Sequence, residues 1–211
     1  MIENIQLVGQ NFSLHPSGAM LWEEKQMLLI SDVHLGKISH FRKYGSAVPQ
    51  NAIAENFECL TRVVDHFQPE KICFLGDLFH SSLNLEWDLF ENWMQDISAE
   101  VMLVVGNHDI ISALKYEAVG IKIVSELILE NLLLTHHPEI RENYFNLCGH
   151  LHPGFKLNGA GKQQVKLRCF YKSGEQMILP AFGEFTGNYW ISPNVGDQVF
   201  VITKKEVILV Y

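Results

Sequence analysis

Apolar residues along the chain follow two kinds of pattern, one typical of helices and one typical of buried strands. In residues 51–67 they recur every three or four positions, which places them on one face of a helix that ends before Pro69. This stripe consists of Ile53, Phe57, Leu60, Val64 and Phe67. A second helical stripe consists of Phe90, Trp93, Met94 and Ile97. Unbroken apolar runs that predict strands lie at residues 28–30, 72–75, 101–105 and 132–134.

The alternation of strand and helix predicts parallel strands that are joined by crossover helices. After about residue 120 the pattern turns to strands, so we expect a second sheet packed on the first. The later candidate strands are 121–124, 127–129, 165–171, 177–179, 199–202 and 207–210. The sequence therefore predicts one α/β domain over residues 1–211, without repeats or a Pro/Gly-rich linker.

Composition narrows the classes of protein. Hydrophobic residues make up 47% and charged residues 19% of 211 residues, as in a globular domain with a substantial core. The net charge of −8 argues against a general nucleic-acid coat protein but allows a local cationic site. The first residues show no signal-peptide pattern, and no run approaches ~20 apolar residues. Four cysteines without a C-x-x-C pair predict reduced thiols and a cytoplasmic location.

Polar residues collect where the apolar runs end. The five blocks are Asp32-Val33-His34, Gly76-Asp77, Gly106-Asn107-His108-Asp109, His136-His137 and Gly149-His150-Leu151-His152. Sites in open α/β sheets form beyond the carboxyl ends of strands, so these blocks can converge. In extended backbone, residues i and i+2 point to the same side, which would let the pairs 32/34 and 150/152 each face one ion. The glycines before the ligands would let the backbone turn sharply and approach closely.

The donors are carboxylates, an amide and imidazoles. This set suits Mn, Fe, Zn, Co or Mg better than thiolate-seeking metals. Two aspartates against two divalent ions leave a net charge of about +2, which would attract phosphate to an acidic protein.

The five blocks, taken in order, resemble the calcineurin-like metallophosphoesterase superfamily, whose pattern is D-x-H, G-D, G-N-H-D or G-N-H-E, a His, and G-H-x-H. The match runs from Asp32 to His152 and no block is degraded. The segments DVHLGKISHFRKYGSAVP and CFYKSGEQMILPAFGEFTG also resemble the ligase-associated DNA damage response endonuclease family.

The resemblance implies two mixed sheets packed face to face with helices outside, in four layers α/β/β/α. It implies a phosphodiesterase with two divalent ions, manganese first among them, and a partner such as DNA or a DNA-repair ligase or helicase. One ion would be held by Asp32, His34, Asp77 and His152. The other would be held by Asp77, Asn107, His136 and His150, with His137 as the alternative to His136. Asp77 would bridge the ions.

Two metals ~3.5–4 Å apart would stabilise the attacking and leaving oxygens and generate a hydroxide from water near neutral pH. His108 would protonate the leaving oxygen or stabilise developing charge. Asp109 would either orient His108 or cap the next helix. We also consider Arg42 and His80 as substrate-binding residues. The segment 179–187 offers Phe182 and Phe185 either for base stacking or for the core.

Three functions compete. A nuclease needs a basic or aromatic surface that leads away from the metals, for which Lys37, Arg42 and Lys43 are the nearest candidates. A small-molecule phosphoesterase, acting on a cyclic nucleotide or a nucleotide conjugate, needs a closed pocket. A metal-free scaffold would have lost ligands, and this chain has kept all of them.

Overall fold

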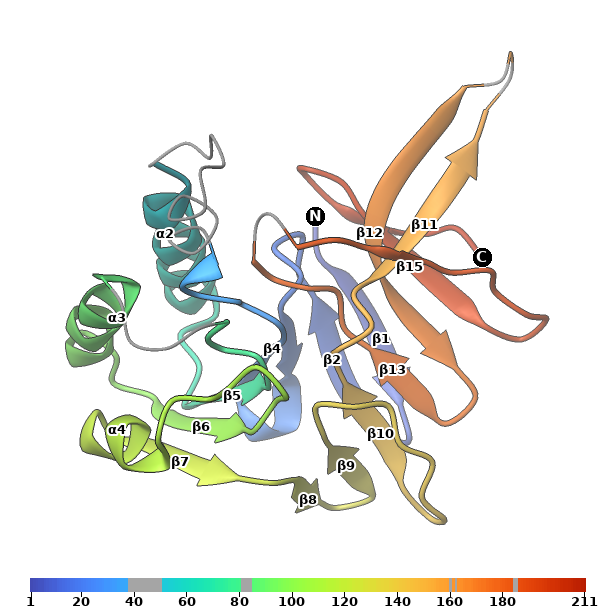
Figure 1. The fold of residues 1–211 in the computed structure, drawn as a ribbon. Helices are drawn as coiled ribbons and strands as arrows, with labels where there is room; N and C mark the ends of the chain where they lie inside the picture. The colour runs from blue at the N-terminus through green and yellow to red at the C-terminus, as the bar shows by residue number, and fades with distance from the viewer. Residues whose placement is uncertain (38–50, 81–84, 160, 162, 184–185) are drawn as a thin grey trace.

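Two mixed β-sheets pack face to face, and helices cover the outer face of the first sheet (Figure 1). The computed structural model describes residues 1–37, 51–80, 85–159, 161, 163–183 and 186–211. The first sheet has the order β1-β2-β3-β4-β5-β6-β7. Its strands are β1 (Glu3–Leu7), β2 (Gln10–Leu14), β3 (Met20–Trp22), β4 (Met27–Ile30), β5 (Lys71–Leu75), β6 (Glu100–Val104) and β7 (Ile121–Val124). The first four strands form an antiparallel meander, and β4 to β7 are parallel, as the alternation of strand and helix predicts.

The second sheet follows the order β14-β11-β12-β13-β10-β9-β8, with β15 paired to β12 and β16 paired to β15. Its strands are β8 (Leu127–Leu129), β9 (Leu132–Leu134), β10 (Phe145–Cys148), β11 (Pro153–Asn158), β12 (Gln164–Ser173), β13 (Gln176–Ile178), β14 (Tyr189–Trp190), β15 (Gln198–Ile202) and β16 (Val207–Leu209). The apolar run at 132–134 is therefore a strand of the second sheet, parallel to β10.

The alternation of side chains along the central strands creates two cores. On β4, Leu28 and Ile30 pack toward the helices, whereas Leu29 packs into the core between the sheets. On β5, Phe74 packs toward the helices and Leu75 packs into the core between the sheets. These strands are buried on both faces, which explains why their sequences are unbroken runs of apolar residues.

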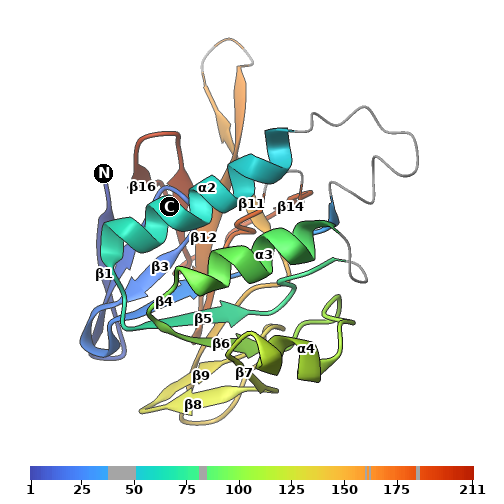
Figure 2. The same ribbon diagram turned by 90° about the vertical axis from the view of Figure 1, so that its left-hand side faces the viewer.

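The helices α2 (Asn51–Phe67), α3 (Leu85–Gln95) and α4 (Ala113–Ala118) lie side by side over the first sheet (Figure 2). A short 3-10 turn, η1 (Glu23–Lys25), joins β3 to β4. The bounds of α2 are those that the apolar stripe predicts. The second stripe is longer than its helix, because α3 ends at Gln95 while Ile97 still packs on the same core.

The two packed mixed sheets confirm the predicted fold class, but the described helices form only one outer layer. On the far side, the second sheet carries a small apolar cluster of Cys169, Ile191, Val199 and Val201. Among the helices of the described segments, none is both long and apolar enough to cross a membrane.

Candidate metal centre

The five polar blocks meet at one edge of the molecule, beyond the carboxyl ends of strands from both sheets. Asp32, Asp77 and Asn107 follow β4, β5 and β6 of the first sheet. His136 follows β9, and His150 follows β10, both in the second sheet. Backbone hydrogen bonds hold the blocks together, with the His34 N–H donating to the Asp77 carbonyl at 2.9 Å.

One group of donors is formed by Asp32, His34 and His152, whose ligand atoms lie within 4.8 Å of one another. His152 Nε2 is 3.1 Å from Asp32 Oδ1 and 3.3 Å from His34 Nε2. His34 Nε2 also lies 3.9 Å from Asp77 Oδ2. Two imidazole nitrogens and two carboxylate oxygens therefore point into one small volume, which fits a divalent cation.

A second group lies on the other side of Asp77. His136 Nε2 is 3.5 Å from Asp77 Oδ1, 3.0 Å from Asn107 Oδ1 and 3.2 Å from His150 Nδ1. The two oxygens of Asp77 thus face different groups, one toward His34 and the other toward His136. A carboxylate in this position can contribute to both groups of donors.

The structure distinguishes His136 from its neighbour His137. His136 is buried, and its Nδ1 donates a hydrogen bond to the Leu75 carbonyl at 2.9 Å, which leaves Nε2 free to face the donors. His137 is exposed, although its ligand atom also lies within 4.8 Å of those of His136 and His150. His136 therefore has the orientation of a fixed ligand, and His137 lies at the open side of the centre.

Burial and neighbouring charge set the protonation of these groups. Burial lowers the pKa of His34 to about 3, so its imidazole is neutral and can donate a lone pair. Burial opposes the ionised form of Asp32, yet hydrogen bonding and charge from His152 hold its pKa below the usual range. Burial likewise works against the charged form of His152, but Asp32 raises its pKa overall. A bound cation would take the place of the proton that these two side chains share.

The backbone at the candidate ligands is not extended, so the prediction that residues i and i+2 face one ion through an extended strand is wrong. Five of the seven candidate ligands have left-handed backbone, with φ of 54° at Asp32, 53° at His34, 52° at Asp77, 67° at His150 and 48° at His152. The side chains converge because the chain coils tightly at each strand end. Non-glycine residues adopt such angles rarely, and they cluster at functional sites.

The three glycines before the ligands leave no room for a side chain. A Cβ at Gly76 would overlap the ring of His136, and one at Gly106 would overlap Asp77. A Cβ at Gly149 would overlap Ser31 Oγ and approach Asp32 Oδ2 at 2.5 Å. Close approach of backbone to ligand, as the sequence suggests, is therefore confirmed at all three positions.

Asp109 has neither of its two predicted roles. The N-cap of α4 is Ser112, and the described hydrogen bonds of Asp109 do not reach the ring of His108. Its carboxylate accepts hydrogen bonds from the N–H groups of Asp77 and Gly106 at 2.8 Å and of Phe79 at 3.1 Å. Asp109 thus ties the loop after β6 to the loop after β5.

Other groups that hold the candidate ligands in place could not be predicted from the sequence pattern. The hydroxyl of Ser31 donates to Asp32, and the N–H of His150 donates to Asp32 Oδ2 at 2.9 Å. The backbone of Phe182 and Gly183 docks on the strand end that carries Asp32, through N–H bonds of 2.9 and 3.2 Å. Phe182 is buried, so it belongs to the core rather than to a stacking surface, and Phe185 lies outside the described residues.

His108 and His80 lie beside the centre. The main-chain N–H of His108 donates to Asp77 Oδ1 at 2.8 Å, which holds its half-buried side chain next to the ligands. The ring of His80 lies 4.6 Å from that of His108 and 5.3 Å from that of His34, measured between centroids. Lys37 is half-buried, and burial lowers its pKa. Arg42 and Lys43 lie outside the described residues.

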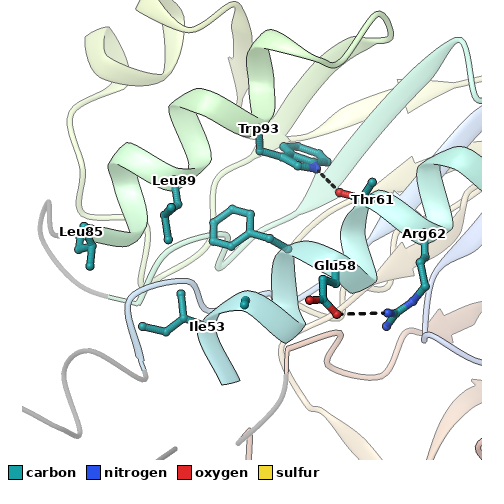
Figure 3. A pocket seen from close by; sticks show the side chains of 9 residues that line it. Ile53, Glu58, Thr61, Arg62, Leu85, Leu89 and Trp93 are labelled. Atoms are coloured by element: carbon teal, nitrogen blue, oxygen red, sulfur yellow. Dashed lines mark hydrogen bonds and ion pairs between the residues drawn. The ribbon is translucent and has the colours of Figure 1, made fainter. Parts of the chain in front are cut away.

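An apolar groove of about 620 Å³ lies elsewhere, between α2 and α3 (Figure 3). Leu85, Leu89 and Trp93 of α3 face Ile53 of α2 across it, and the Trp93 indole donates to Thr61 Oγ1 at 3.2 Å. None of the seven candidate ligands lines this groove. It is therefore separate from the metal centre.

Several solved structures are similar to this chain, and one of them matches it over its whole length. Nuclease MPE from Pseudomonas putida is 28% identical, with 100% of both chains covered and a TM-score of 0.83. The protein of unknown function AQ665 from Aquifex aeolicus is 18% identical over 60% of this chain and 77% of that one, with a TM-score of 0.44. The E. coli phosphoesterase Yfce is 15% identical over 87% and 97%, also with a TM-score of 0.44. A search of curated proteins found no match.

The match to the nuclease is consistent with the narrower resemblance to the DNA damage response endonucleases. The family model described as calcineurin-like phosphoesterase matches residues 26–195, a span that contains every candidate ligand. That family and the nuclease neighbour identify the chain as a phosphoester hydrolase. The chain belongs to the calcineurin-like phosphoesterase family.

Proposed function

We propose that this chain is a nuclease that hydrolyses phosphodiester bonds in DNA with the help of two divalent metal ions. The observation that carries the proposal is the position of Asp77, whose oxygens face two separate groups of donors. The nuclease neighbour, which covers the whole chain, supports a nucleic acid as the substrate, and the narrower family resemblance is the reason for choosing DNA. The same resemblance is the reason for proposing a role in DNA repair, with a repair ligase or helicase as a candidate partner. The cysteine pattern of the sequence is the reason for proposing the cytoplasm as the location.

The ligands of the first ion would be Asp32, His34, Asp77 and His152, and those of the second Asp77, Asn107, His136 and His150. When bound, two such ions lower the pKa of water and stabilise the attacking and leaving oxygens of an in-line displacement. Carboxylate, amide and imidazole donors suit Mn, with Fe, Zn, Co and Mg as alternatives. The protein contributes the fixed positions of these donors, which the glycine contacts and the Asp109 carboxylate maintain.

His108 would act on the substrate rather than on the metals. Its main-chain bond to Asp77 sets the side chain beside the donors, so the imidazole could donate a proton to the leaving alkoxide or a hydrogen bond to the phosphoryl oxygens. His80, with its ring against that of His108, would position it or contact the phosphate. We keep Arg42 as a candidate phosphate contact on sequence grounds.

A substrate screen tests the proposal. Metal-free protein is supplied with Mn²⁺ and offered bis(p-nitrophenyl) phosphate, p-nitrophenyl phosphate, cyclic nucleotides, and single- and double-stranded DNA. We expect cleavage of DNA and of the diester, faster than the monoester, and loss of both activities in Asp77→Ala. A wide preference for the monoester or for cyclic nucleotides, with intact DNA, would refute the nuclease and favour a small-molecule phosphoesterase.

A further inference from the structure

The hairpin of β11 and β12 has an unusual charge for this acidic chain. Residues 153–174 contain five of the 16 basic residues and none of the 24 acidic residues. The basic residues are Lys156, Lys162, Lys166, Arg168 and Lys172. The outer part of the hairpin projects beyond the rest of the second sheet (Figure 1).

Two of these lysines lie directly opposite each other. Lys156 and Lys166 are register partners of the antiparallel pair, and both are exposed. Their ammonium groups lie 5.6 and 5.5 Å from the centre of the Trp190 ring, which attracts both of them. In the described part of the chain, neither lysine has a carboxylate partner within ion-pair distance. Like charges opposite each other destabilise a β-sheet, and a bound anion would relieve the repulsion.

This surface continues directly from the metal centre. His152 is followed at once by β11, and Tyr189 and Trp190 of β14 pair with the first two residues of that strand. The N–H of Tyr189 donates to the His152 carbonyl at 3.0 Å. Lys156 lies four steps along the chain from His152, which in a strand is a distance of about 13 Å. A single strand with 3.4 Å or more per phosphate would cross that distance in at most about four nucleotides.

We propose that Lys156 and Lys166, held over Trp190, form a lysine ridge that binds the phosphate backbone of a single DNA strand whose scissile bond lies in the metal centre. The assignment rests on the proposed nuclease function. Tyr189 is 63% exposed beside His152 and offers a ring on which an unpaired base can stack. Unstacked bases are available in a single strand, so the ridge favours single-stranded over duplex DNA.

The test measures binding apart from cleavage. A fluorescein-labelled thymidine 20-mer is titrated into metal-free protein, and anisotropy gives the affinity at salt concentrations between 50 and 200 mM. Lys156→Gln/Lys166→Gln should lower the slope of log affinity against log salt by about 1.4, since each phosphate contact in a single strand contributes ~0.7. The wild type would then lose about sevenfold more affinity over this range than the variant.

The control variant Lys71→Gln/Lys122→Gln removes the same two charges at the amino ends of β5 and β7, opposite the metal centre. It should keep the wild-type slope. Both variants should hydrolyse bis(p-nitrophenyl) phosphate at the wild-type rate, because that substrate does not reach the ridge. The melting temperature of the ridge variant should change little, because the removed repulsion between the lysines is offset by the loss of their attraction to Trp190.

The outcomes of these measurements separate the lysine ridge from the proposed nuclease function. An unchanged slope in the ridge variant, or an equal change in the control, overturns the ridge even if the wild type cleaves DNA. A slope change confined to the ridge variant supports the ridge even if the wild type cleaves no DNA, in which case only the nuclease function fails. A wild type that neither binds nor cleaves the oligonucleotide overturns both.

Discussion

The carboxylate of Asp109 joins two ligand-bearing loops, and Asp109→Asn is the smallest change that can break this connection. In the wild type, Oδ2 accepts the N–H groups of Asp77 and Gly106, and Oδ1 accepts that of Phe79. An asparagine keeps the shape but has one acceptor oxygen instead of two. In its better orientation the amide oxygen faces Asp77 and Gly106, and the NH₂ group then faces the N–H of Phe79.

The cost follows from these contacts. A buried N–H without an acceptor costs ~1–3 kcal/mol, and the two remaining bonds lose their charge-assisted character, at about 1 kcal/mol each. Part of this loss of free energy is offset in the variant. Burial raises the pKa of Asp109, so the ionised side chain is costly in the wild type, and the neutral asparagine avoids that cost. We expect a net loss of about 2–3 kcal/mol in the free energy of unfolding. For a domain of this size that corresponds to a melting temperature lower by roughly 4–12 °C.

The assay is thermal unfolding of metal-free protein, so that lost metal does not contribute, followed by titration with Mn²⁺. Metal affinity should also fall, because the backbone N–H of Asp77 is one of the groups that Asp109 holds. Asp65→Asn serves as the control, because it removes one carboxylate from an exposed position on α2. A variant Asp109→Asn with wild-type stability and metal affinity would show that the carboxylate does not join the loops.

Three further predictions concern the metal centre itself. Asp77→Ala should lose more metal than any other single ligand substitution, because its two oxygens face both donor groups, and elemental analysis showing full occupancy would refute the shared position. His108→Ala should keep its metal but lose ~10²–10⁴-fold in rate on DNA and much less on bis(p-nitrophenyl) phosphate, whose leaving group needs no proton; equal losses on both substrates would indicate charge stabilisation instead. Saturating Mn²⁺ should stabilise the folded chain by ~2.7 kcal/mol per site at 100 times its dissociation constant, measured as a higher melting temperature, and an unchanged value would argue against ordered sites.

The sequence predicts the parallel part of the first sheet, β4 to β7, and the meeting of the polar blocks well, because both depend on local pattern. Strands buried on both faces read as apolar runs, and polar residues at their carboxyl ends mark the edge at which they meet. The N-terminal meander was missed because its outer strands are half-buried, with polar residues such as Asn4 and Gln6 among the apolar ones. The strand at 132–134 looks like the others but pairs with β10, since the runs alone do not reveal which sheet a strand joins.

The groups that hold the ligands could not be predicted in the same way. Contacts such as Gly183 on the strand end of Asp32 join residues far apart in the chain, and nothing in their local sequence marks them. The lysine ridge was missed for a related reason. Lys156 and Lys166 are ten positions apart, and only the hairpin register makes them neighbours over Trp190.

At the candidate ligands with left-handed backbone, a residue must tolerate that conformation and also supply a donor atom to a cation. Asp and His meet both requirements. Left-handed backbone in a non-glycine residue costs of order 1–3 kcal/mol, and five such positions together approach the whole stability of a domain. Asp and His tolerate this conformation better than most residues, and they are also the side chains that bind hard and borderline cations. The choice of Asp and His therefore reduces the strain at the same positions where they supply donors. The backbone strain that remains must be offset by the rigid strand ends and by hydrogen bonds such as those to Asp109. We therefore expect that substitution of residues that hold the ligand loops will weaken metal binding, although no donor atom is removed.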